Sequence, residues 1–323
     1  MHYVVGDVHG CYDEFTALRK KIEKKDPDAV IILTGDLIDR GPKVWEMLRW
    51  AMKNITEDGK YQCICGNHED MVISWYYDWA TWYASENRKN YAKPKTSYGF
   101  DEVLKENGLD TPEKVLPIME FFQSLPFRKE VRAEFPDGSE VLFDIVHGAD
   151  SFEEGISEDY RRELNLWGRE GSVVDERTIV IHGHTPTMCY DYLIMGDQPN
   201  RPGMIGYQKQ DINLDGGCCF SDITNAPCFL CAICLETMEE IYPRMIWSQL
   251  MHHGKAPKTR KEAVAEAKEF LIKYPWKENI YRKEILEMLR INPNKGESAP
   301  EPEQNPEQNI ENSLDKPETE EVE

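Results

Sequence analysis

The sequence lacks the features that mark membrane, nucleic-acid-binding and exported proteins. Within its 323 residues no apolar run approaches the roughly 18 residues that a membrane-spanning helix needs. Only 38 residues are basic against 59 acidic ones, and the formal charge of −21 argues against non-specific binding to nucleic acid or anionic lipid. The first residues, Met1–Asp7, contain neither a basic region nor a long apolar region of the kind found in export signals. We therefore expect a cytoplasmic protein with no membrane and no nucleic-acid partner, and the sequence leaves its oligomeric state open.

Nine cysteines, an odd number in a chain without an export signal, favour free thiols over disulfides. The spacing Cys228-x2-Cys231-x2-Cys234 resembles part of an iron–sulfur or zinc motif. These residues lie in an apolar run that should form a strand, where Cys231 and Cys234 would face opposite sides of the sheet. We therefore predict core thiols at these positions. By the same alternation, Cys63 and Cys65 should share one face of their strand.

Short apolar runs alternate with segments of helical pattern, which is typical of an α/β domain. A helical, aromatic-rich stretch from about Met71 to Glu120 is expected to cap the core and to take no part in chemistry. Pro136-Asp137-Gly138 should make the turn of a hairpin. Strands are expected at Tyr3–Val5, Ala29–Leu33, Tyr61–Cys65, Phe127–Glu134, Glu140–Val146, Thr178–Ile181, Asp211–Leu214 and Cys228–Leu235, and further helices at Tyr12–Lys25 and Val44–Lys53.

The composition changes toward the end of the chain and suggests three parts. Two more helices are expected at Thr259–Tyr274 and Lys277–Ile291, on either side of Pro275. From Pro293 onward Pro, Glu, Gln and Asn dominate, and such a composition cannot bury enough apolar surface to offset chain entropy. We predict a main domain at 1–253, a helical extension at 254–292 and a disordered acidic tail at 293–323.

Five predicted strands run directly into polar residues at their carboxyl ends, where open α/β sheets place ligands. The segments are Gly6-Asp7-Val8-His9, Gly35-Asp36, Gly66-Asn67-His68-Glu69, His147-Gly148 and His182-Gly183-His184. One such dipeptide would most simply cap a turn, but five strand ends indicate a single shared site. Imidazole and oxygen donors of this kind suit borderline divalent metals such as Mn, Fe or Zn. The candidate metal ligands are Asp7, His9, Asp36, Asn67, His147 and His184.

In their order along the chain these motifs resemble the phosphoprotein phosphatase family of calcineurin-like metallophosphoesterases. GDVHG, GDLIDRGP and GNHE match its leading motifs, and VHGAD, Trp167-Gly168-Arg169, HGHTP and the NLDGG segment extend the match over about residues 2–240. The family includes serine/threonine protein phosphatases of bacteria and phages and symmetrical dinucleoside tetraphosphatases. The resemblance implies an α/β fold in which two mixed β-sheets form a sandwich flanked by helices. It also implies a centre of two divalent metal ions, with Mn favoured and Fe or Zn as alternatives.

The resemblance also implies a role for each residue. Asp7 and His9 would hold the first ion, Asn67, His147 and His184 the second, and Asp36 would bridge the two. A metal-bridging hydroxide would attack phosphorus. His68, oriented by Asp39, would protonate the leaving group as general acid. Arg40 and Arg169 would bind the phosphate through bidentate hydrogen bonds, although Arg161 and Arg162 lie near Arg169 in the sequence. His182 is expected to support the site and not to bind metal.

The motifs leave the substrate open. We favour a phosphomonoester hydrolase, foremost a serine/threonine protein phosphatase, whose substrate is a phosphorylated protein or a small phosphoester. Protein phosphatases of the family usually carry an arginine immediately before GNHE, where this chain has Cys65. Symmetrical hydrolysis of bis(5'-nucleosyl) tetraphosphates therefore stays an alternative. A non-catalytic scaffold that binds phosphorylated partners is a third reading, disfavoured because every ligand position is intact.

Overall fold

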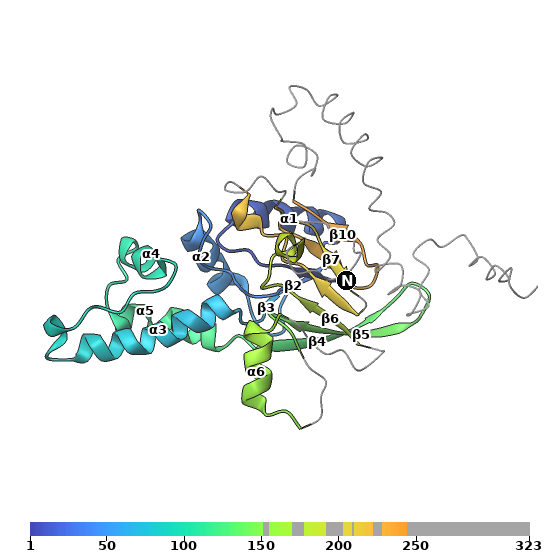
Figure 1. The fold of residues 1–323 in the computed structure, drawn as a ribbon. Helices are drawn as coiled ribbons and strands as arrows, with labels where there is room; N and C mark the ends of the chain where they lie inside the picture. The colour runs from blue at the N-terminus through green and yellow to red at the C-terminus, as the bar shows by residue number, and fades with distance from the viewer. Residues whose placement is uncertain (151–154, 170–177, 192–202, 209, 222–227, 244–323) are drawn as a thin grey trace, which may run out of the picture. The chain divides into compact units, whose positions relative to one another are not determined.

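A computed structural model describes residues 1–150, 155–169, 178–191, 203–208, 210–221 and 228–243. The described part contains ten strands in two mixed five-stranded sheets, with α-helices around them (Figure 1). This confirms the predicted α/β sandwich. The predicted helical extension at 254–292, with its helices Thr259–Tyr274 and Lys277–Ile291, and the predicted tail at 293–323 lie outside the described residues. No described helix is both long enough and apolar enough to cross a membrane.

The first sheet has the strand order β10-β9-β1-β2-β3. Strands β1 (His2–Val5), β2 (Val30–Leu33) and β3 (Tyr61–Cys63) pair in parallel, with β3 at one edge, and β9 (Ala232–Cys234) and β10 (Glu240–Ile241) add antiparallel strands on the other side of β1. The apolar runs of β1, β2 and β9 are continuous and not alternating because both faces of the sheet are buried there. Parallel pairing brings the carboxyl ends of β1, β2 and β3 to the same edge, and Gly6, Gly35 and Gly66 follow these ends within one to three residues.

The second sheet has the order β4-β5-β6-β8-β7. Strands β5 and β6 and strands β6 and β8 pair in parallel, whereas β4 and β7 pair antiparallel at the edges. Val4 and Ile32 of the first sheet share one core with Phe143 and Ile181 of the second, so the two sheets face each other. The strands are β4 (Arg128–Glu134), β5 (Glu140–Val146), β6 (Thr178–His182), β7 (Gly206–Gln208) and β8 (Asp211–Asn213).

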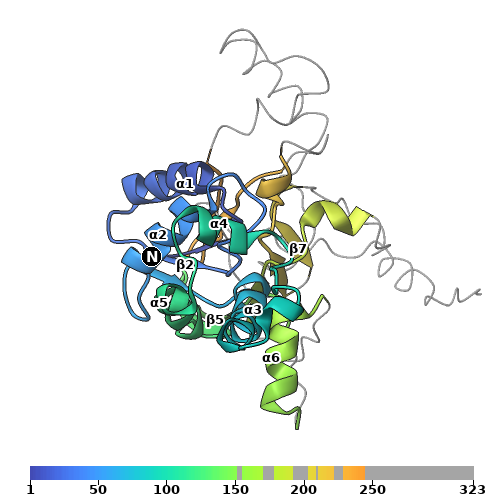
Figure 2. The same cartoon turned by 90° about the vertical axis from the view of Figure 1, so that its left-hand side faces the viewer.

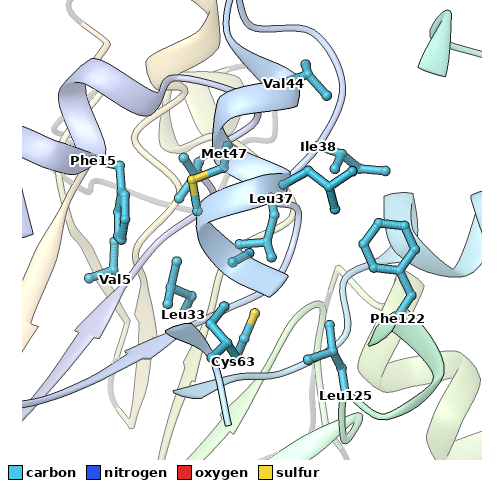
Figure 3. Close-up of a cluster of buried hydrophobic side chains, with 14 of the residues drawn as sticks. Val5, Phe15, Leu33, Leu37, Ile38, Val44, Met47, Cys63, Phe122 and Leu125 are labelled. Carbon is cyan, nitrogen blue, oxygen red and sulfur yellow. The ribbon is translucent and has the colours of Figure 1, made fainter. Parts of the chain in front are cut away.

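The other face of the first sheet packs on helices α1 (Tyr12–Lys25) and α2 (Val44–Asn54). Figure 3 shows Phe15 of α1 and Met47 of α2 above Val5 and Leu33 of the strands. Phe15, Leu18 and Ile22 lie on one stripe of α1 and are fully buried, which is the spacing of a helix covering a sheet.

The prediction of one helical stretch from Met71 to Glu120 is wrong, because this part of the chain is divided into several helices. The structure has α3 (Asn67–Ala84), a short 3-10 turn at Arg88–Asn90, α4 (Phe100–Glu106) and α5 (Pro112–Gln123). Gly99, with φ of 82°, starts α4, and Gly108, with φ of 76°, follows it, so two left-handed residues divide the stretch. Helices α3 and α5 lie side by side (Figure 1 and Figure 2).

Among the described α-helices and strands, three were not predicted. Helix α6 (Glu158–Trp167) buries only Asn165 and Leu166, so its sequence carries little apolar pattern. Strands β7 and β10 contain three and two residues. Such short strands carry no readable alternation.

The cysteine predictions are confirmed. All nine cysteines, of which seven are buried, are free thiols. Cys231 and Cys234 belong to the cores on opposite faces of the first sheet, while Cys63 and Cys65 belong to the same core. No cysteine takes part in the candidate metal-binding groups of the described residues.

Candidate metal centre

All six candidate metal ligands lie together at the carboxyl ends of the strands. Asp36 Oδ2 is 3.3 Å from His9 Nε2 and 3.4 Å from His147 Nε2. Asn67 Oδ1 is 2.8 Å from His147 Nε2 and 3.1 Å from His184 Nδ1. Asp7 joins the same cluster, because its Oδ2 accepts the backbone N–H of His184 at 2.8 Å. Five strand ends, from both sheets, therefore supply one site.

The backbone bends sharply at these ligands. His9, Asp36 and His184 adopt left-handed conformations, with φ of 43°, 49° and 67°. Such conformations are uncommon for residues other than glycine and cluster at functional sites. Close approach also demands glycine at Gly183, where an added Cβ would overlap the Asp7 carboxylate.

Asp36 is shared by the two groups of side chains that could hold an ion. One group is His9, Asp36 and His68, and the other is Asp7, Asp36 and His147. Burial would raise the pKa of Asp36, but the neighbouring imidazoles, first that of His147 and then that of His68, outweigh burial and hold that pKa well below its usual range. Asp36 is thus an anion at the centre of the site. The grouping differs from the expected one in two respects, since His68 and not Asp7 lies with His9, and Asp7 lies with His147.

Backbone carbonyls fix the orientation of two imidazoles. His9 Nδ1 donates to the Ile38 carbonyl at 2.9 Å, and His147 Nδ1 donates to the Thr34 carbonyl at 2.8 Å. In both rings Nε2 then faces Asp36. Metal-binding histidines are commonly held in this way, with one nitrogen on a carbonyl and the other toward the ion.

The donor set and its charge fit divalent cations. Burial lowers the pKa of both His9 and His184 to about 3, so both rings are neutral, as a metal ligand must be. Within the described residues, the buried His184 Nε2 has no hydrogen-bond partner. Burial would lower the pKa of His147, but Asp36 and Asp7 raise it to about 10. The site therefore favours positive charge at this position.

His68 and Asp39 form a hydrogen-bonded pair beside the cluster. His68 Nδ1 donates to Asp39 Oδ2 at 2.6 Å, and both side chains are buried. The other nitrogen, Nε2, lies 3.8 Å from Asp36 Oδ2 and so faces the candidate metal centre. A carboxylate on Nδ1 orients the ring and stabilises its protonated form.

The two arginines expected to bind phosphate lie at different points of the site. Arg40 Nη1 donates to His9 Nε2 at 2.6 Å, and Arg169 Nη1 donates to Thr185 Oγ1 at 2.6 Å, one residue after His184. Arg161 is bound to Asp150, and Arg162 is paired with Asp70. The geometry therefore favours Arg169 among these neighbouring arginines. His182 Nε2 lies 2.9 Å from Asp211 Oδ1, and His182 is not part of the candidate metal groups found among the described residues.

Two supporting residues escaped the sequence analysis. Thr34 Oγ1 donates to Asp7 Oδ1 at 2.9 Å while its carbonyl holds His147. The fully buried Glu69 carboxylate accepts the backbone N–H groups of Asp36, Leu37 and Gly66. A polar residue at the end of an apolar strand was the signal for Thr34, and the final letter of GNHE was the signal for Glu69.

Comparison with known proteins identifies the family. Residues 3–208 match the calcineurin-like phosphoesterase family, so the chain belongs to that family. The description of that family agrees with the class of enzyme that the sequence motifs predict.

Among its relatives are bacterial tetraphosphatases. The chain is 40% identical over 73 residues to a symmetrical bis(5'-nucleosyl)-tetraphosphatase of Neisseria gonorrhoeae. The matched residues are 23% of this chain and 25% of the relative. The match thus spans about a quarter of that enzyme. The chain is also 26% identical over 255 residues to the asymmetrical bis(5'-nucleosyl)-tetraphosphatase PrpE of Bacillus velezensis, covering 68% of this chain and 85% of the relative. A serine/threonine phosphatase structure from Saccharomyces cerevisiae matches at 15% identity and a TM-score of 0.38, covering 66% of this chain and 65% of that one.

Proposed function

We propose that the protein hydrolyses dinucleoside tetraphosphates at a centre of two divalent metal ions. The observation that carries the proposal is the convergence of two carboxylate–imidazole groups on Asp36 next to the Asp39–His68 pair. The choice of substrate is supported by the relatives, which are named for this reaction. Cys65 supports it too, since that position carries an arginine in the protein phosphatases that the motifs resemble.

In this proposal Asp7 and His9 hold one ion, Asn67, His147 and His184 hold the other, and Asp36 contacts both. We propose manganese for both sites, because mixed imidazole and oxygen ligands suit a borderline divalent ion. When bound, two such ions supply Lewis acidity toward the phosphoryl oxygens and activate water for attack on phosphorus.

His68 is proposed to act as general acid and Asp39 to position it. The leaving oxygen needs a proton as its bond to phosphorus breaks, and His68 Nε2 is the nitrogen that faces the cluster. Asp39 Oδ2 holds Nδ1 at 2.6 Å and keeps the ring in the required orientation. The pair is buried, so little water competes for the proton.

Arg40 and Arg169 are proposed to bind the phosphate chain. A guanidinium group can donate two parallel hydrogen bonds to phosphate oxygens, and these bonds strengthen as charge develops in the transition state. Arg40 lies on the Asp36 and His9 side and Arg169 on the His184 side. The two would therefore bind from different directions.

A serine/threonine phosphatase activity is the second candidate, and the Asp39–His68 pair favours it. An alkoxide is a poorer leaving group than a nucleotide phosphate, so a phosphoserine ester depends more strongly on a general acid. A buried His68 that is held by a short hydrogen bond to Asp39 meets that requirement.

Hydrolysis of diadenosine tetraphosphate, a phosphoserine peptide and an aryl phosphate, measured side by side with Mn²⁺, tests the proposal. We expect the highest kcat/KM with the tetraphosphate and almost no activity in Asp36→Asn. In His68→Asn, we expect kcat to fall by about 10²- to 10⁴-fold with the phosphoserine peptide and by less with the tetraphosphate. Faster hydrolysis of the phosphopeptide would make the second candidate the function, and absence of Mn²⁺-dependent turnover would contradict both.

A further inference from the structure

A segment that we call the strap, residues 91–98, runs back along α3 toward the candidate metal centre. The indole Nε1 of Trp82 donates to the Tyr91 carbonyl at 3.2 Å, and that of Trp75 donates to the Pro94 carbonyl at 3.1 Å. Between these two bonds, Lys93 Nζ lies 5.3 Å from the centre of a Trp79 ring. The order of contacts, from Trp82 to Trp75, shows that the strap is antiparallel to the helix.

The same face of α3 carries His68. Trp75, Trp79 and Trp82 follow His68 by seven, eleven and fourteen residues, which are offsets that return to one face of an α-helix. A strap held on the tryptophans therefore arrives above His68 if it continues in the same direction. Tyr98 is the residue that arrives there, with its ring centre 4.6 Å from that of His68 and tilted by 40°.

The end of the strap is fixed by local hydrogen bonds. Thr96 donates its backbone N–H and its hydroxyl to Asp101 Oδ1, at 3.2 and 2.8 Å. The Asp101 N–H donates back to Thr96 Oγ1 at 3.1 Å. Tyr98 lies between these two anchored residues, so its position over His68 is set by the backbone on both sides.

Tyr98 combines contact with the site and exposure to solvent. The Arg40 guanidinium carbon lies 5.3 Å from the centre of the Tyr98 ring and 5.5 Å from that of Phe220. Tyr98 nevertheless stays 49% exposed, whereas His68 is 1% exposed. An aromatic ring thus borders both the proposed general acid and a proposed phosphate-binding arginine, and much of its surface is free to contact a ligand.

We propose that Tyr98 forms a subsite for a planar ring carried by the leaving group of the substrate. The proposal rests on the proposed function, because the leaving group is located by His68 as its proton donor. A leaving oxygen at His68 places the atoms attached to it beside Tyr98. An aryl ring bonded to that oxygen can stack on the tyrosine, and a nucleobase can do so when the phosphates and ribose between it and that oxygen fold back toward Tyr98, whereas a phosphoserine side chain has no ring.

Binding of two phosphonates that the enzyme cannot hydrolyse tests the subsite without relying on turnover. Phenylphosphonate carries a planar ring and methylphosphonate does not, so their affinities for the full Mn²⁺-loaded chain, measured by calorimetry, isolate the ring. We expect phenylphosphonate to bind roughly twofold to tenfold more tightly, which is the affinity ratio that one aromatic contact supplies. Tyr98→Ala should bring the ratio of the two affinities close to one, and Tyr98→Phe should keep the preference for phenylphosphonate.

Tyr91→Ala is the matched control, because Tyr91 is a 68% exposed tyrosine of the same strap whose backbone carbonyl, and not its ring, is bound by Trp82. Tyr91→Ala should keep the preference for phenylphosphonate over methylphosphonate. Equal affinities in the wild type, binding of neither phosphonate, or an equal loss of both in Tyr98→Ala would overturn the subsite.

Turnover distinguishes the source of the ring. If the ring is a nucleobase, Tyr98→Ala should raise KM for diadenosine tetraphosphate, and if it is an aryl group, KM for the aryl phosphate should rise instead. KM for a phosphoserine peptide should rise less than KM for the substrate that carries the ring. A chain that prefers phenylphosphonate but hydrolyses no substrate would support the subsite and contradict the proposed function. An active enzyme without that preference would support the proposed function and contradict the subsite.

Discussion

Replacing Glu69 by alanine tests whether the candidate site depends on one buried carboxylate. Glu69 Oε2 accepts the N–H groups of Asp36 and Gly66 at 2.9 and 3.0 Å, and Oε1 accepts that of Leu37 at 2.9 Å. These three donors belong to the loops after β2 and β3, so Glu69 ties the two loops together. In Glu69→Ala all three donors lose their acceptor.

The expected loss of stability follows from the burial of these groups. Leaving one buried N–H unsatisfied costs about 1–3 kcal/mol, so three could cost up to about 9 kcal/mol if their effects added. Water can enter the vacated space and bind some of them, and the effects of neighbouring groups are not additive. We therefore expect the free energy of unfolding to fall by about 3–5 kcal/mol, a large share of the 5–15 kcal/mol of a typical domain.

Urea unfolding of the full chain, followed by tryptophan fluorescence, measures this loss. The matched control is Glu102→Gln, since Glu102 is an exposed residue whose partner Lys95 is 3.8 Å away, and it should change stability by less than about 0.5 kcal/mol. Mn²⁺ affinity should fall as well, because the backbone of Asp36 loses an anchor. Wild-type stability together with wild-type Mn²⁺ affinity in Glu69→Ala would refute the argument.

Two further predictions concern other parts of the structure. In Gly183→Ala the new Cβ would overlap the Asp7 carboxylate, so we expect Mn²⁺ to bind on the order of tenfold more weakly in a calorimetric titration, and unchanged affinity would contradict the assigned role of Asp7. Burial, together with its hydrogen bond to Asp150, raises the pKa of Asp144 to about 7, so the folded state keeps a proton that the unfolded state releases near pH 4. The stability that this group contributes is therefore present below pH 4 and is lost as pH rises through 7, by at most about 1.4 kcal/mol per pH unit. This pH dependence should be smaller in Asp144→Asn. Urea unfolding at several pH values measures the difference.

The parts of the fold that could be predicted are those in which local pattern and tertiary role agree. Strands β1 and β2 are short apolar runs that end in glycine and aspartate, and that pattern is what a buried parallel strand leading into a site requires. Helix α6 could not be predicted because it buries only two residues and its sequence is mostly polar. The break after α3 was missed because the 85–99 segment is held by the tryptophans of α3 and not by a pattern of its own.

The residues of the candidate site also fall into those that could be named from the sequence and those that could not. The six candidate ligands could be named because each follows a strand within a motif, and all six lie in one cluster. Tyr98 could not be named, because thirty residues separate it from His68 and only the path of the strap brings them into contact. Thr34 is visible in the sequence as a polar residue at the end of an apolar strand, but nothing in the sequence shows that its backbone carbonyl holds His147.

Helix α3 links the candidate site to the proposed subsite. Its first three residues, Asn67, His68 and Glu69, contribute in turn a candidate metal ligand, the proposed acid and the carboxylate that ties two loops together. Successive helical residues point in directions about 100° apart, so three consecutive side chains can serve three different surroundings. The register that sends His68 toward Asp39 also sends Trp75 and the following tryptophans to the face that holds the strap. A change in the rotation of α3 would therefore move the acid and the tyrosine above it together, which makes the helix the element that keeps the two in register.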